Sequence, residues 1–139
     1  MLAEGNIPEV SEDELLARYI IASSHVRKSD QTVKPDAFIP HPHRDLSVTR
    51  HVQATEDELW LVGMNVATSR GKTLRGRADV VARVCLQQSL SVLAMPLPNN
   101  QNHADISGWP AEKPEQKLLA IEIAKAAKLV QTPGDATSH

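Results

Sequence analysis

The sequence contains few aromatic residues, a single cysteine and no long apolar segment. Only 3% of its 139 residues are aromatic, so aliphatic side chains must form the core, and single-strand nucleic-acid readers that stack bases on aromatic rings are disfavoured. Because Cys85 is the only cysteine, no disulfide can form within the chain, which fits a reducing compartment. No apolar stretch approaches the roughly 20 residues that a membrane-spanning helix needs.

The charge is also nearly balanced. A formal net charge of −2 at pH 7 argues against a generally basic nucleic-acid-binding protein, although it leaves room for a local basic patch. Residues 1–8 lack the basic start and apolar run of a signal peptide. We therefore expect a cytoplasmic protein with no membrane partner, while nucleic-acid binding stays an open question.

Length and composition predict one domain. A chain of 139 residues is near the commonest domain size, and its 41% of hydrophobic residues can form a core without disulfides or a metal. We expect a loose N-terminal arm over residues 1–10, one domain over residues 11–131 and a polar tail over residues 132–139.

Three segments carry helix signals. Capping boxes that begin at Ser11 and Thr55 predict helices, because each places a Glu three residues after a hydroxyl residue. The second helix is apolar almost all round, which predicts burial, and its Gly63 predicts close approach to another backbone segment. Pro114 suits the first turn of a final helix whose apolar stripe extends to Val130.

Short apolar or alternating segments between these helices predict strands. The predicted strands cover residues 46–51, 78–86, 90–97 and 104–106, and residues 25–35 form a loop or an exposed hairpin. Three helices with short strands between them predict an α+β fold, in which a small mixed or antiparallel sheet packs with the helices.

Histidines are the most distinctive polar residues. His41 and His43 lie two positions apart, as do His103 and Asp105, so each pair projects to one side of an extended chain. Since imidazoles suit zinc or another transition metal, His41, His43 and His103 are candidate metal ligands. In an enzyme, His103 is the candidate general base and Asp105 its orienting carboxylate. The alternative is that these histidines are ordinary exposed or hydrogen-bonded residues.

Arginines form the second candidate site. Arg44 and Arg50 flank the strand predicted over residues 46–51, and Arg75 and Arg77 belong to a basic stretch that follows the second predicted helix. Forked guanidinium groups recognise phosphate and carboxylate, so these four residues are a candidate anion-binding site for a phosphate-containing ligand or a protein partner. The alternative is a solvated basic loop that favours the dipole of the preceding helix.

The sequence argues against a phosphate-binding P-loop and against a reactive cysteine. Gly71, Lys72 and Thr73 are similar to the end of a phosphate-binding P-loop, but Val66 stands where that loop needs a glycine, and the triplet follows a helix rather than a strand. Cys85 lies in an apolar segment without neighbours that would activate a thiol, so it is interpreted as a small core residue.

Several short stretches resemble a family of small bacterial proteins. They are Phe38–Pro40, Leu46–Arg50, Gly76–Asp79, Asn102–His103 and Gly108–Pro110, within the central half of the chain. No activity is established for that family, so the resemblance implies a bacterial origin and no particular mechanism.

These features predict a bacterial accessory module that binds an anionic partner through its Arg-rich and His-bearing surface. Two alternatives stay open. One is a small, metal-dependent enzyme that acts on a phosphate-containing substrate through His103, Asp105 and an arginine such as Arg50 or Arg77. The other is a structural subunit of an oligomer, with Trp60 or Trp109 buried between subunits.

Overall fold

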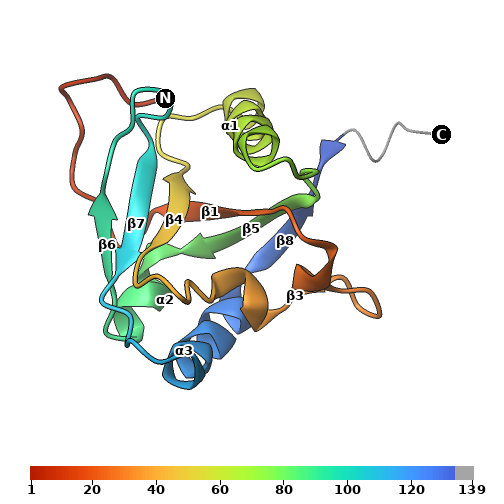
Figure 1. Cartoon of the computed structure of the whole chain (residues 1–139). Coiled ribbons are helices and arrows are strands. Elements are labelled where there is room, and N and C mark those ends of the chain that lie inside the picture. Colours follow the sequence, from red (N-terminus) through yellow and green to blue (C-terminus); the bar gives the residue numbers. More distant parts are fainter. Residues whose placement is uncertain (134–139) are drawn as a thin grey trace.

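A computed structural model describes residues 1–133, which form a six-stranded antiparallel sheet with helices on both faces (Figure 1). The strand order is β6-β7-β4-β1-β5-β8. The strands are β1 (Leu15–Ile20), β4 (Leu46–Arg50), β5 (Gly76–Val81), β6 (Ser91–Ala94), β7 (His103–Ser107) and β8 (Lys128–Gln131). A separate hairpin of β2 (Val26–Arg27) and β3 (Thr32–Val33) lies within residues 25–35, where a hairpin was one of the two expectations. The predicted α+β fold is confirmed.

The helices enclose one core on each face of the sheet. Helix α1 (Glu56–Ser69) covers the smaller core, which contains Ala17 and Tyr19 of β1. The larger core lies on the other face, below α2 (Ala82–Gln87), α3 (Lys113–Ala126) and the short 3-10 helix η2 (Pro35–Phe38). A second 3-10 turn, η1 (Ser23–His25), leads into β2. Figure 1 shows α1 and α3 on opposite sides of the sheet.

The helix predicted after Ser11 is wrong, because this segment forms the central strand β1. Glu14 does reach back to the backbone N–H of Ser11, at 2.7 Å, but it closes a turn rather than starting a helix. β1 pairs with a strand on each side and is buried on both faces, with Leu16 and Ile20 in one core and Tyr19 in the other. An apolar run buried on both faces has no strict alternation, which is why the pattern matched a helix.

The second capping box is confirmed. Thr55 accepts from the backbone N–H of Glu58 at 3.1 Å, and Glu58 accepts from the N–H of Thr55 at 2.9 Å, at the start of α1. The prediction that α1 is buried all round is wrong, since Leu61 and Met64 are exposed on its outer side. Gly63 does sit at a close approach, but the neighbour is the ring of Tyr19 rather than a backbone segment.

Two other predicted boundaries are wrong. The strand predicted over residues 78–86 stops at Val81, where the chain turns into α2. The final helix starts near Pro114 as predicted but ends at Ala126, and Val130 belongs to β8, which pairs with β5. In both cases the sheet decides the boundary, because a short segment takes the structure that its partner strands allow.

Residues near the chain start contact the loop before β7. Leu2 is buried, and its backbone N–H donates to Asn102 Oδ1 at 2.8 Å. The division into an arm over residues 1–10, a domain over residues 11–131 and a tail over residues 132–139 stays a prediction, and residues 134–139 lie outside the described part of the chain. Among residues 1–133, no helix has both the length and the apolar character needed to cross a membrane.

Candidate functional site

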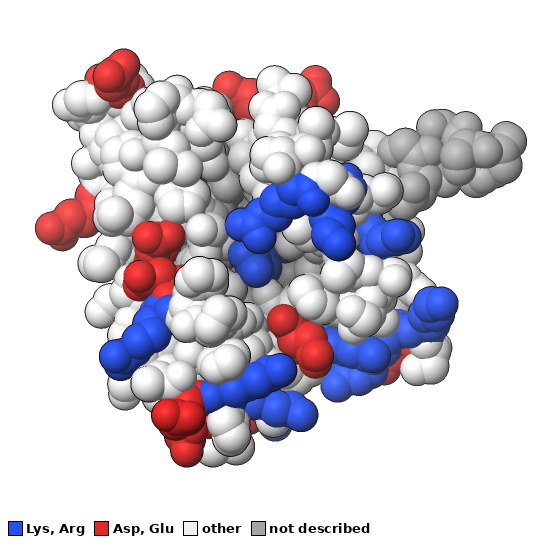
Figure 2. Space-filling model, viewed as in Figure 1, with Lys and Arg blue, Asp and Glu red and all other residues white. Residues whose placement is uncertain are grey.

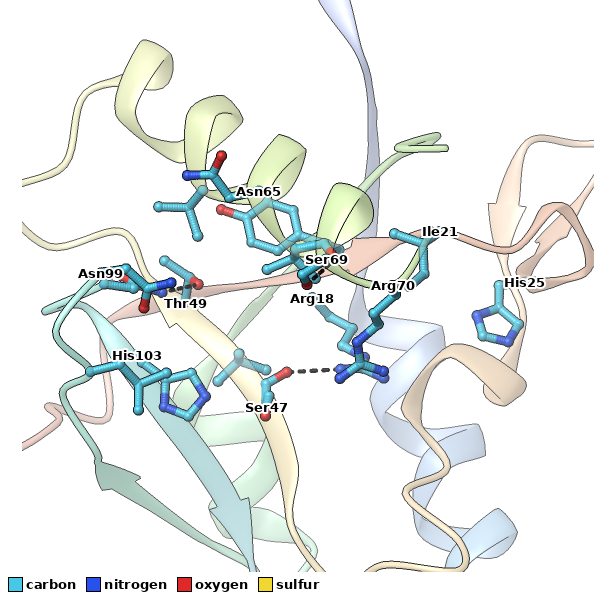
Figure 3. Close-up of a pocket in the computed structure, with 16 residues that line it drawn as sticks. Arg18, Ile21, His25, Ser47, Thr49, Asn65, Ser69, Arg70, Asn99 and His103 are labelled. Atoms are coloured by element: carbon cyan, nitrogen blue, oxygen red, sulfur yellow. Dashed lines mark hydrogen bonds between the residues drawn. The ribbon is translucent and has the colours of Figure 1, made fainter. Parts of the chain in front are cut away.

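A pocket of about 270 Å³ opens beside α1, where strands β1 and β4 separate (Figure 3). All six residues of β1 pair with β5, but only Leu16 and Ala17 pair with β4. The two strands therefore part after Ala17, and the gap is bounded by β1, β4, α1 and the segment of residues 97–103. This divergence, rather than a loop insertion, creates the pocket.

Arg18 follows Ala17, the last residue of β1 that pairs with β4, and it fills part of the gap. Its Nε donates to the carbonyl of Ala37 at 2.9 Å, and its Nη1 donates to the carbonyl of Ser47 at 3.0 Å. The backbone N–H of Arg50 donates to the carbonyl of Asn102, next to β7. Successive residues of a strand direct their backbone groups to opposite neighbours, so the carbonyl of Ser47, three residues earlier, faces β1. The guanidinium of Arg18 thus gives that carbonyl the hydrogen bond that a backbone N–H of a paired strand would otherwise donate.

Arg70 brings a second guanidinium to the same place. Arg70 is the C-cap residue of α1, and Figure 3 shows its side chain ending beside that of Arg18. Figure 2 shows basic side chains gathered around a hollow below α1. Burial, together with the positive charge of Arg70, lowers the pKa of Arg18 to about 10. The pocket is therefore a place where positive charge is poorly compensated.

Neither guanidinium of the pocket has a carboxylate partner. Among residues 1–133, no ion pair within 4.0 Å includes Arg18 or Arg70, whereas Arg50, Arg77 and Arg83 all pair with acidic side chains. Two like charges that meet in a partly desolvated site favour the binding of an opposite charge. The pocket therefore suits an anion.

Amide and apolar groups line the rest of the pocket. In Figure 3, Asn65 and Asn99 lie on the opposite side of the two guanidinium groups from His25. Asn100 is buried and donates to Thr49 Oγ1 at 3.0 Å, which anchors the segment that carries Asn99. Val48 and Val62 form part of the wall. The pocket thus joins a cationic region to one that can hydrogen-bond an uncharged group.

His103 also lines this pocket, and Asp105 lies beside it on β7. The Nδ1 of His103 lies 2.8 Å from the carbonyl of Met95 and donates to it, since a carbonyl can only accept. The Nε2 of His103 faces Asp105 Oδ1 at 3.7 Å, which is too long for a hydrogen bond. Burial raises the pKa of Asp105 above its ordinary value. The structure therefore brings the predicted pair together, but a backbone carbonyl orients the imidazole.

The three candidate metal ligands do not converge. His41 and His43 are exposed and precede the start of β4, whereas His103 pairs with Thr49 near the other end of that strand. Within residues 1–133, no group of three His, Cys, Asp or Glu side chains is arranged to hold a metal ion. The residues present therefore do not fit the zinc or other transition-metal site considered from the sequence.

Arg50 and Arg77 of the predicted anion site are buried and already neutralised. Arg50 binds both carboxylate oxygens of Glu14 at 2.8 Å. Arg77 binds Glu56 at 2.8 and 2.9 Å and Asp79 at 3.0 and 3.2 Å, and its guanidinium lies 4.7 Å from the ring centroid of Trp60. Their partners make both arginines part of the protein's own charge network.

The other two predicted arginines lie apart from the pocket. Arg44 donates from Nε to the carbonyl of Trp109 at 3.0 Å, and Trp109 itself is fully buried in the larger core rather than at a subunit surface. Arg75 is exposed just before β5 and does not line the pocket. The structure therefore does not gather Arg44, Arg50, Arg75 and Arg77 into one site.

Sequence reasoning missed Arg18 and gave Arg70 no role of its own. One signal was present for Arg18, because it is the only charged residue in the apolar run from Leu15 to Ile21. A charge within a buried strand needs a specific partner or a function. No comparable signal marks Arg70, whose position in the pocket depends on how α1 packs on the sheet.

The chain matches no protein-family model, no curated protein and no solved structure in the comparisons made with each. The resemblance to a bacterial family therefore stays a prediction, and the functional argument rests on the geometry of the pocket.

Proposed function

We propose that the protein binds a small phosphate-bearing ligand in the pocket formed by β1, β4 and α1. The observation that carries the proposal is the meeting of Arg18 and Arg70 without a carboxylate partner among residues 1–133. The proposal keeps the class of function expected from the sequence, an anion-binding module, and moves the site to different arginines.

The number of free donors favours phosphate over a single carboxylate. Arg18 uses two of the five N–H donors of a guanidinium on Ala37 and Ser47, so three remain for a ligand. Arg70 makes no side-chain hydrogen bond to another described residue. A phosphate monoester carries about −1.5 to −2 charge at pH 7 and offers three acceptor oxygens, which matches two guanidinium groups.

The remaining walls limit what is attached to the phosphate. Asn65 and Asn99 offer both donors and acceptors for hydroxyl or amide groups, and Val48 and Val62 contact apolar edges. A volume of about 270 Å³ lies just below the ~300–1,000 Å³ of sites for drug-sized ligands. The best-fitting class is a phosphate monoester of a small polar alcohol, such as a sugar phosphate or a nucleoside monophosphate.

Isothermal titration calorimetry tests this proposal. Sugar phosphates and nucleoside monophosphates are titrated beside their dephosphorylated parents and inorganic phosphate. We expect at least one monoester to bind, its parent not to bind, and Arg70→Gln to weaken binding about 10- to 100-fold, since a charged hydrogen bond contributes roughly 1.5–3 kcal/mol.

Arg75→Gln is the matched control, because Arg75 is an exposed arginine outside the pocket and the substitution removes the same charge. Equal weakening by both substitutions would show general charge attraction rather than a site. If every monoester binds no better than its parent, the proposal fails.

The presence of His103 in the same pocket favours a second function, hydrolysis of the bound ester. An imidazole fixed by the Met95 carbonyl is placed to take part in proton transfer to or from a bound ligand. Phosphate release from a ligand that binds is the assay. Turnover that His103→Gln abolishes while binding persists would support an enzyme, whereas binding without turnover in the unaltered protein would leave the binding function alone.

A further inference from the structure

The longest part of the chain without Asp, Glu, Lys or Arg runs from Val84 to Ala104, and it spans 21 residues. With 23% charged residues in the whole chain, a stretch of this length would contain about five charges in an average protein of this composition. The uncharged stretch includes β6 and the segment that connects it to β7. Ten of these 21 residues are exposed, and the absence of charge among them requires a physical reason.

This uncharged stretch is also the most apolar part of the surface. Eight large hydrophobic residues are exposed among residues 1–133, and four of them lie within it: Leu86, Leu93, Met95 and Leu97, with 43%, 48%, 46% and 41% of their surface exposed. Leu93 and Met95 lie two positions apart and share one face of the sheet, and we call these two residues, together with the free edge of β6, the β6 edge surface. A cluster of exposed apolar groups at one place on a protein marks an interaction site.

The backbone of β6 has hydrogen-bonding groups that face away from the sheet. β6 is the last strand on its side of the sheet, as Figure 1 shows, and pairs only with β7. Met95 donates its N–H to the carbonyl of His103, so alternate residues turn their backbone toward β7. Val92 and Ala94 therefore direct their N–H and C=O groups outward, and no backbone hydrogen bond from another described segment reaches them.

The two edges of the sheet differ in how they are protected. β8, at the other edge, carries the exposed Lys128. Charged side chains, above all lysine, normally prevent an edge strand from pairing with another chain. β6 has no such charge, and Pro96 only limits the length of the free edge, because proline lacks the N–H that a continued ladder would need.

We propose that two copies of this chain associate by antiparallel pairing of β6 with β6 of the second copy. Antiparallel pairing of identical strands has two-fold symmetry, so one surface serves both partners. With Leu93 at the two-fold axis, Val92 of each copy pairs with Ala94 of the other copy. Each of these two pairs exchanges two backbone hydrogen bonds, which gives about four in total. Because the edge has no charged side chains, two copies do not repel each other there. A charged partner would find no opposite charge with which to form an ion pair.

The pairing also covers apolar surface. Leu93 and Met95 project from the face of the sheet that carries α1, and in the dimer Leu93 lies against Leu93 of the second copy. The proposal does not depend on the anion-binding function, since neither Leu93 nor Met95 lines the pocket that contains Arg18 and Arg70.

Sedimentation velocity of the full chain over about a hundredfold range of concentration tests the dimer. We expect a mass that rises toward twice that of the chain. Leu93→Lys, which places two ammonium groups against each other at the axis, should raise the dissociation constant at least about tenfold. Leu118→Lys is the control, because Leu118 is exposed on α3 outside the uncharged stretch, and it should leave the dimer unchanged.

Hydrogen exchange of the unaltered protein gives a test that needs no variant. The amides of Val92 and Ala94 should become more protected as concentration rises, while exchange at the β8 edge stays constant. A monomer at every concentration overturns the proposal, and so does a dimer that Leu93→Lys and Leu118→Lys affect equally or that leaves the Val92 and Ala94 amides unprotected.

Discussion

Substitution of Gly63 by alanine tests the packing of α1 on the sheet. A Cβ atom at position 63 would lie 2.7 and 2.8 Å from two ring carbons of Tyr19 and 3.1 Å from Leu74 Cδ2. Real Cβ contacts are not found below 3.0 Å, so the ring of Tyr19 must move. That ring is buried, and its hydroxyl donates to the carbonyl of Leu59, which restricts the directions in which it can shift.

Two opposing effects set the size of the change. Alanine is favoured over glycine in a helix by about 1 kcal/mol. Overpacking of a filled core typically costs about 1–3 kcal/mol, and a weakened Tyr19–Leu59 hydrogen bond adds roughly 1 kcal/mol. The unfavourable terms are larger, and we expect Gly63→Ala to lower the free energy of unfolding by about 1–3 kcal/mol.

Urea unfolding monitored by circular dichroism measures this difference. The control is Gly63→Ala in a Tyr19→Leu background, where the ring is absent and the helix preference of alanine should remain as a gain of up to about 1 kcal/mol. If Gly63→Ala alone is more stable than the unaltered protein, or if its effect is the same in both backgrounds, the close approach of Tyr19 does not explain the glycine.

Two further predictions concern buried ionisable groups. Burial alone would raise the pKa of Asp79 and Glu14, but hydrogen bonds to Asp79 from His51 and Arg77 and to Glu14 from Arg50 hold both pKa values below the ordinary range. Their stabilising effect is therefore complete above about pH 5, where the carboxyls of the unfolded chain are also ionised, and it is lost as pH falls toward the lowered values of the folded protein. Urea midpoints should drop between about pH 5 and pH 3, and a flat profile would contradict the ion pairs. Burial raises the pKa of Cys85 to about 12, so a disulfide reagent at about pH 8 should label it only after unfolding, and rapid labelling of the folded protein would refute its core position.

Local chemistry was enough to predict part of this fold. The helix after Thr55 needed only a hydroxyl, a glutamate and the peptide N–H groups between them, and these contacts are present. The start of α3 followed in the same way from the fixed φ of Pro114. His103 and Asp105 were predicted to share a face, and they do, because residues two apart in a strand always project to one side.

Tertiary pairing decided what local pattern could not. The capping contact at Ser11 closes a turn instead of starting a helix. Residues 15–20 form a strand because they pair with a strand on each side and are buried on both faces of the sheet. The same holds for the arginines. Arg50 and Arg77 resemble Arg18 in the sequence, yet carboxylates from Glu14, Glu56 and Asp79 meet only the first two.

The sequence by itself determined the fold class, the starts of α1 and α3 and the shared side of His103 and Asp105, because these depend on neighbours a few positions away. Only the tertiary structure decided which charges are neutralised, where β1 and β4 separate and which strand ends the sheet. Those properties depend on residues that are distant in the chain, and a linear pattern contains no record of their positions in space. The anion-binding pocket and the β6 edge surface both belong to this second group.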